Sequence, residues 1–159
     1  MEVLTMERLV EFTKGMVKTI IEEKGQQHVP MLLVEGDGGV TPVVFADIPK
    51  EYWGGVALDL LKKTDAKGYV FVCETWTADS KINPESAKRV IDGELKVSEL
   101  PPDDRKDCVM VLSQEKGRSK MWMSEVDEIP GGRKMGEWKE MSNGEEECKM
   151  TNNILPEVW

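Results

Sequence analysis

Polar and aromatic residues stand at the ends of two strongly apolar segments, 69–77 and 107–114, where a small binding site could form. If these segments pair as antiparallel strands, the end of the first lies beside the start of the second. A carboxylate and an aromatic ring next to an arginine can bind a small polar ligand or a peptide. A salt bridge that covers the end of the core, with the aromatic ring as packing, is the alternative. The candidate ligand-binding residues are Glu74, Trp76, Arg105 and Asp107.

A second candidate is a metal-dependent hydrolytic site. Asp127, followed by Glu137 and Lys139, has the spacing found in metal-dependent nucleases and resembles that class in this fragment alone. In such sites carboxylates hold Mg²⁺, and the lysine orients or activates the attacking water. A small metal-dependent hydrolase or nuclease using strand-end carboxylates is therefore the alternative function, although chance explains one such triplet easily. Other acid-x-Lys triplets begin at Glu22, Asp65, Asp79, Glu94, Asp104 and Glu147.

Cysteine and histidine usage favours a non-catalytic protein. Cys73, Cys108 and Cys148 are widely spaced, without a Cys-x-x-Cys pair, whereas metal sites usually combine closely spaced ligands. Cys73 and Cys108 lie in apolar segments, which is typical of small buried side chains. His28 is expected at the surface or in a turn just before a strand, and a Cys73–His28 pair would require an outward-facing cysteine. The sequence thus predicts no catalytic residue, no metal ligand and no cofactor.

The charge of the chain limits its partners. A net charge of −9 argues against direct nucleic-acid binding, because affinity for phosphates depends on Lys and Arg. The same charge suits docking on a basic protein surface. No segment approaches the roughly 18 consecutive apolar residues of a membrane helix. The N-terminus has neither the basic start nor the continuous apolar stretch of a signal peptide, so a cytoplasmic location without a membrane partner is expected.

Hydrophobic periodicity predicts helices and strands in a definite order. Leu9, Phe12, Met16 and Ile20 recur at helical spacing, and Gly25 stands where that helix should end. Two apolar runs flank a glycine-rich turn and predict a hairpin, and Asp47 and Pro49 predict the start of a second helix ending near residue 64. The predicted strands are 31–34, 43–45, 69–77, 107–114, 120–126 and 134–141, and a short helix is predicted from Pro84.

These elements predict an α+β fold built on a central antiparallel sheet. Both faces of 69–77 begin apolar, so this strand should be central and covered on both sides. The order helix, hairpin, helix and three strands (α-β-β-α-β-β-β) resembles profilin-like and roadblock-type domains, which implies a sheet flanked by helices. The Glu-Thr-Trp strand end followed by Pro-Pro-Asp-Asp-Arg also resembles a pattern in prokaryotic and phage proteins that has no function attached to it. The predicted domain spans 1–141, with a weakly ordered tail at 142–159.

Two further features bear on function. Met121, Trp122 and Met123 place soft apolar surface on both faces of one strand, and such surface often marks an interface, so self-association into a homodimer is predicted there. The long connection 78–106 has the length of a binding loop or lid. The favoured function is a non-catalytic binding or assembly module with 78–106 as its recognition element.

Overall fold

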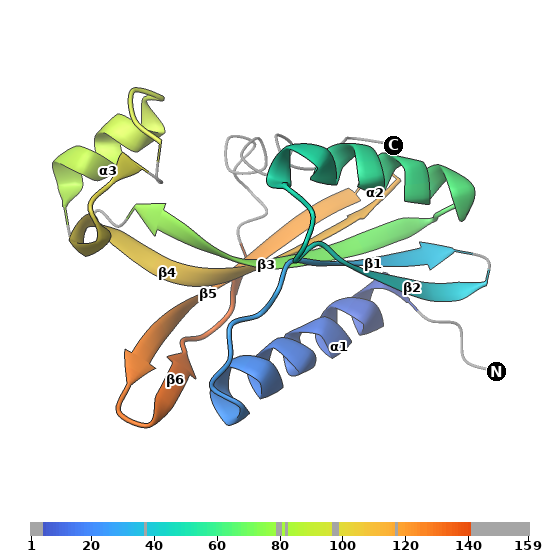
Figure 1. Cartoon of the computed structure of the whole chain (residues 1–159), viewed down its shortest axis with the longest axis horizontal. Helices are drawn as coiled ribbons and strands as arrows, with labels where there is room; N and C mark the ends of the chain where they lie inside the picture. The colour runs from blue at the N-terminus through green and yellow to red at the C-terminus, as the bar shows by residue number, and fades with distance from the viewer. Residues whose placement is uncertain are drawn as a thin grey trace.

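An antiparallel β-sheet forms the middle of the computed structural model, which describes residues 5–36, 38–78, 81, 83–96, 99–116 and 118–140 (Figure 1). The strand order is β2-β1-β3-β4-β5-β6, and β7 pairs with β5. This confirms the predicted α+β class. The strands are β1 (Met31–Gly36), β2 (Gly39–Val44), β3 (Gly68–Ala78), β4 (Arg105–Glu115), β5 (Arg118–Ile129), β6 (Gly132–Met135) and β7 (Lys139–Glu140). The predicted tail 142–159 lies outside the described residues.

Helix α1 (Met6–Lys18) covers one face of the sheet (Figure 1). The Thr5 side chain accepts a hydrogen bond from the amide of Arg8 and so caps the helix. The helix continues as a π-helical turn, η1 (Thr19–Glu23), and ends at Gly25, whose φ of +60° few other residues tolerate. The inward side chains of this helical segment are Leu9, Val10, Thr13, Val17 and Ile21.

Phe12 was predicted to face the core, and that prediction is wrong. Its side chain is 63% exposed. At about 100° per residue, the buried positions of α1 form an arc that excludes Phe12, although a spacing of three from Leu9 fitted the pattern. The error arises because Leu9 lies at the edge of the inward face.

The predicted hairpin is confirmed as β1 and β2, with Gly36 paired to Gly39 at the turn. Gly39 has a φ of +112°, which explains the glycines at this position. Strand β2 is an edge of the sheet and carries Pro42, whose ring nitrogen has no hydrogen to donate to a further strand.

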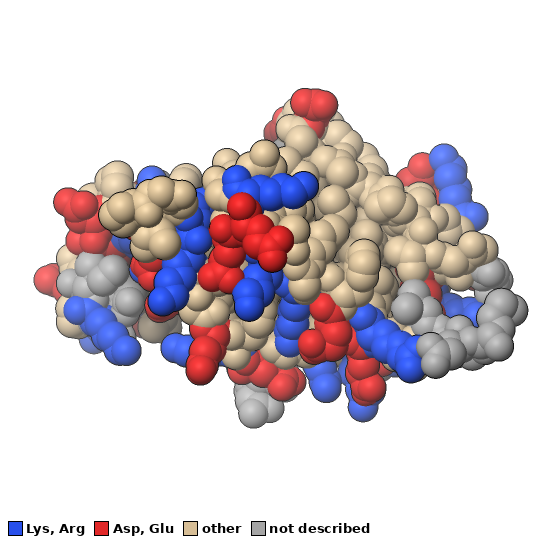
Figure 2. Space-filling view, turned by 90° about the horizontal axis from the view of Figure 1, so that it is seen from below, with Lys and Arg blue, Asp and Glu red and all other residues tan. Residues whose placement is uncertain are grey.

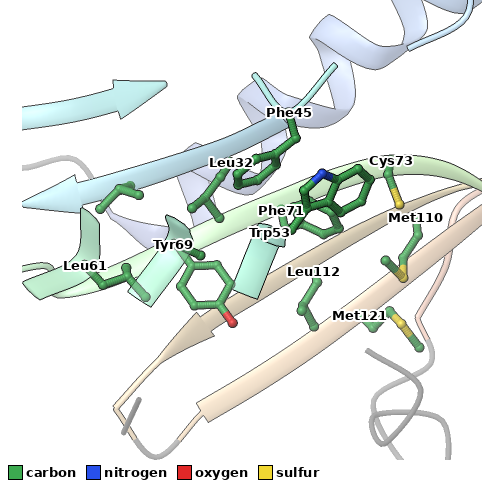
Figure 3. Close-up of a cluster of buried hydrophobic side chains, with 12 residues drawn as sticks. Leu32, Phe45, Trp53, Leu61, Tyr69, Phe71, Cys73, Met110, Leu112 and Met121 are labelled. Atoms are coloured by element: carbon green, nitrogen blue, oxygen red, sulfur yellow. The ribbon is translucent and has the colours of Figure 1, made fainter. Parts of the chain in front are cut away.

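Helix α2 (Trp53–Lys63) covers the opposite face of the sheet from α1 (Figure 1). It begins later than predicted, because Asp47 lies in a turn and Pro49 in irregular backbone before the short helix η2 (Lys50–Tyr52). The Trp53 indole donates to the carbonyl oxygen of Ile48 over 2.7 Å and stacks on Phe45 at 5.4 Å. These contacts fix the start of α2 over the aromatic core that Figure 3 shows.

Strands β3 and β4 are central, as predicted, and pair along their whole length. Val70 and Val72 pack under α1, whereas Tyr69 and Phe71 pack under α2, and all four are fully or almost fully buried. The Tyr69 hydroxyl donates to Gln114 Oε1 across the two strands. Two paired strands that are covered on both faces thus form the centre of the sheet.

Strand β5 extends beyond β4 and bends toward the C-terminal end of α1, carrying β6 with it (Figure 1). The Met135 amide donates to Glu22 Oε2 over 3.1 Å, and the Ser124 hydroxyl donates to the Gly136 carbonyl over 2.8 Å. The predicted strand 134–141 is therefore divided into β6 and the separate β7. The β5–β6 hairpin thus closes over one end of α1.

The connection between β3 and β4 carries helix α3 (Pro84–Ile91), as predicted, beyond the ends of those strands (Figure 1). The Asn83 side chain caps α3 by accepting from the Ser86 amide over 3.1 Å. The same side chain donates to Asp104 over 3.2 Å, in the short helix η4 (Pro102–Asp104). Within the described residues, no helix combines the length and the apolar composition needed to cross a bilayer.

Candidate binding site at the ends of β3 and β4

The register of β3 and β4 brings three of the four candidate residues together. Trp76 lies opposite Asp107, and Arg105 lies opposite Ala78, one pleat further along. Side chains of directly opposed residues project from the same face of a sheet, and so do residues two apart in one strand. Trp76, Arg105 and Asp107 therefore share the face that α1 covers nearer the middle of the sheet.

The closest contact in this group is a stack of Arg105 on Trp76. The guanidinium carbon lies 3.7 Å from the centroid of the indole ring, and the Arg105 Nη1 donates to the carbonyl oxygen of Leu100 over 3.5 Å. Trp76 remains 43% exposed. Among the described residues no carboxylate forms an ion pair with Arg105, so its planar group keeps donors for an incoming acceptor.

Asp107 completes the surface with a negative charge. Its side chain is exposed, and it lies two residues from Arg105 on the same strand and directly across from Trp76. An exposed aromatic ring next to a cation and an anion can contact an apolar group and a polar group of one ligand at the same time. We call Trp76, Arg105 and Asp107 the strand-end site.

Glu74 lies one pleat further in and is engaged inside the protein. Its carboxylate forms a bidentate pair with Arg133 of β6, at 2.5 Å from Oε1 to Nη2 and 3.1 Å from Oε2 to Nη1. The side chains are 8% and 10% exposed, respectively. The hydrogen bond to Glu74 raises the pKa of Arg133, which stays charged. Glu74 is thus the internal partner of Arg133 rather than a neighbour of Arg105.

Arg133 also joins two other segments. Its Nε donates to Glu128 Oε1 over 2.8 Å, and its Nη1 donates to the carbonyl oxygen of Gln26 over 2.9 Å. One guanidinium therefore ties β3, β5, β6 and the segment before β1 together. We call Glu74 and Arg133 the buried ion pair. The sequence does not reveal it, because the two residues approach each other only through the bend of β5.

His28 lies in the core, so the prediction of a surface or turn histidine is wrong. Its side chain is 1% exposed, and its backbone amide donates to the Glu74 carboxylate, which draws the segment before β1 inward. The Nδ1 atom donates to the carbonyl oxygen of Val29 over 2.8 Å, and Nε2 has no partner among the described residues. Burial lowers the pKa of His28, which favours the neutral ring.

The carboxylates considered for a hydrolytic site do not gather. Asp127 forms an ion pair with Lys106, and this hydrogen bond raises the pKa of the lysine. Glu137 and Lys139 are exposed. No group of three or more His, Cys, Asp or Glu side chains within the described residues could hold a metal ion.

The described cysteines lie in buried surroundings. Cys73 and Cys108 are buried on neighbouring strands, and burial raises the pKa of Cys108 to about 12. A thiol with such a pKa is a poor nucleophile near neutral pH. Cys148 lies outside the described residues.

The residues predicted to mediate self-association belong largely to the core of their own chain. Met121 is buried beside α2, and Trp122 packs under α1, where the ammonium of Lys14 lies 4.5 Å from its ring centroid. Met123 is half-buried on the same face as Met121. Much of the soft apolar surface of this strand is therefore covered.

No family model, no curated protein and no solved structure matches the chain.

Proposed function

We propose that this protein is a non-catalytic binding module that recognises a carboxylate-bearing peptide or protein segment at the strand-end site. The observation that carries the proposal is the exposed stack of Arg105 on Trp76, at 3.7 Å, without an ion-pair partner among the described residues. A guanidinium held flat against an indole keeps its edge available for bidentate bonds to a carboxylate.

The surroundings of the stack support recognition of a segment of chain rather than of a free ion. The open part of the Trp76 ring offers apolar contact area, and tryptophan and arginine are the residue types that most often dominate binding energy at interfaces. The predicted recognition element, 78–106, adjoins the site, since Leu100 accepts from Arg105 and Asp104 is held by Asn83.

The backbone beneath the strand-end site is held in place by the buried ion pair. Trp76 is the second residue after Glu74 in β3, and the buried ion pair fixes the backbone there. A pre-ordered arginine and tryptophan lose little conformational freedom on binding, which favours affinity. The alternative hydrolase has no comparable support, because Asp127 is already engaged by Lys106.

The test is binding of peptides that carry Asp or Glu side chains, measured by fluorescence anisotropy of labelled peptides. We expect Trp76→Ala and Arg105→Lys each to weaken binding about tenfold or more, because the lysine keeps the charge but loses the planar stack. Arg118→Lys, at an exposed arginine of the opposite strand end, is the matched control and should bind as the unaltered protein does. Equal binding by the Arg105→Lys variant would refute the proposal.

Self-association through Met121, Trp122 and Met123 and a cytoplasmic location stay parts of this proposal. Because Met121 is buried, a dimer through that strand would have to use Met123 and the half-buried edge of Trp122. A concentration-dependent doubling of mass that Met123→Lys abolishes would support this surface.

A further inference from the structure

Helix α1 presents an outward face that carries an exposed phenylalanine and that no other described helix or strand packs against. Phe12 is 63% exposed on this face, although a phenylalanine side chain gains about 1.5–3 kcal/mol from full burial. Figure 2 views the protein from the α1 side and shows acidic and basic side chains interleaved there beside an uncharged area. Such a surface has no single sign of charge, which disfavours nucleic acid and favours a partner with interleaved charges of its own.

A glycine on the same face lacks an intramolecular reason. Gly15 lies inside α1, where glycine is about 1 kcal/mol less favourable than alanine. Among the described residues, a Cβ added at Gly15 would meet nothing within 4 Å, so packing against them does not require the small residue. Its effect is to leave a gap beside Phe12 into which a side chain of another molecule can enter.

We propose that two copies of this chain associate through the outward faces of α1, packed antiparallel and crossing at Gly15. Phe12 of each copy then enters the gap over Gly15 of the other, and the two-fold axis makes both contacts identical. This interface is distinct from the strand-end site, so it does not depend on ligand binding there, and it is the alternative to self-association through the strand of Met121.

The charges of the helix match this arrangement. Glu11 and Lys18 are both exposed and lie about two turns apart on either side of Gly15. In an antiparallel pair crossing near Gly15, Glu11 of one copy lies beside Lys18 of the other, and the symmetry repeats the pair. In a parallel pair crossing there, Glu11 would instead lie beside the Glu11 of the other copy, and Lys18 beside its Lys18. The pattern therefore selects the antiparallel orientation.

The ion pairs that Glu11 and Lys18 form within their own chain are weak enough to be replaced by pairs between the two copies. Lys14 lies 3.5 Å from Glu11, and Lys18 lies 4.0 Å from Glu22. In each pair one side chain is largely exposed, Glu11 at 75% and Lys18 at 72%, so each pair contributes about 0–1 kcal/mol. Another open surface, the edge of β2, is less suited to pairing with a second copy because Pro42 lacks a backbone N–H to donate. Helix packing is thus the better route to a dimer.

The experiment is sedimentation equilibrium of the full chain over a wide concentration range, with circular dichroism to verify folding. We expect the unaltered protein to reach twice the mass of one chain. Phe12→Glu and Gly15→Gln should each raise the dimer dissociation constant about tenfold or more. Gly15→Gln should at the same time raise the melting temperature of the monomer, because glutamine favours helix. If Gly15 mattered only for the fold of the single chain, Gly15→Gln would not weaken the dimer while stabilising the monomer.

Charge exchange and matched controls complete the test. Glu11→Lys and Lys18→Glu should each weaken the dimer about fivefold, and the double variant should restore it. Ile91→Glu makes the same change as Phe12→Glu at an apolar residue of α3 that is 77% exposed, and it should leave the dimer intact. A monomer at every concentration, a dimer that Phe12→Glu does not weaken, or equal loss in Ile91→Glu or Met123→Lys would each overturn the proposal.

Discussion

The buried ion pair gives the sharpest test of the fold. Arg133→Met removes the guanidinium but keeps much of its apolar length, so Glu74 is left buried with only the His28 amide as a described donor. Breaking a buried pair in this way usually costs about 3–5 kcal/mol. Exposures of 8% and 10% call for little reduction by solvent screening, and the lost bond to Gln26 adds to the cost. We expect a loss of about 4 kcal/mol in the free energy of unfolding near pH 7.

The assay is urea-induced unfolding of the unaltered protein, Arg133→Met, Glu74→Gln and the double variant. Because glutamine carries no charge, the double variant should recover about half of the loss seen in Arg133→Met. The coupling energy is this recovery of about 2 kcal/mol plus the loss measured for Glu74→Gln alone, so it should be at least about 2 kcal/mol. Arg118→Met removes the exposed partner of Glu115, which lies 3.7 Å away, and serves as control with a change of at most about 0.5 kcal/mol. A loss in Arg133→Met no greater than in Arg118→Met, or no recovery in the double variant, would refute the reasoning.

Three further changes probe other parts of the core. Burial lowers the pKa of His28 below its ordinary 6.5, so on acidification the unfolded chain takes up a proton at this residue before the folded protein does. As the pH falls below about 6.5, the free energy of unfolding should therefore decrease less in His28→Asn than in the unaltered protein. Identical pH dependence of urea unfolding in the two proteins would contradict this. Leu112→Ala should cost about 2–5 kcal/mol in urea unfolding, against almost nothing for exposed Ile129→Ala. Gly68→Ala would bring a Cβ within 2.9 Å of the Gln114 carbonyl oxygen and should lower the melting temperature, whereas Gly15→Ala should raise it.

The parts of the fold that the sequence predicts well are those with local signals. Strands β3 and β4 can be predicted because both of their faces carry apolar side chains. The β1–β2 turn can be predicted because its glycines supply the required φ. The start of α2 was placed too early, since Asp47 and Pro49 suit a helix start and a turn equally well. Phe12 shows that helical spacing alone does not locate the edge of a buried face.

The residues of the strand-end site could be predicted from the sequence for a different reason. Antiparallel pairing of neighbouring strands determines which residues face each other, so Trp76 and Asp107 follow from the register once the strands are known. Glu74 belongs to the same strand, yet its partner Arg133 lies beyond the bend of β5, whose direction no local pattern encodes. The buried position of His28 was missed for the same reason, because the amide of this residue is held by Glu74.

Recognition of a carboxylate at the strand-end site, as proposed, has to overcome the acidic character of the chain. With a net charge of −9, the long-range field of the protein repels an acidic segment. Glu74 and Glu128 neutralise Arg133, which leaves Arg105 as the arginine near β3 with donors to spare among the described residues. Attraction at the strand-end site must then be short-ranged and come from the stack on Trp76 and from bidentate hydrogen bonds, so the geometry of Arg105 matters more than its charge.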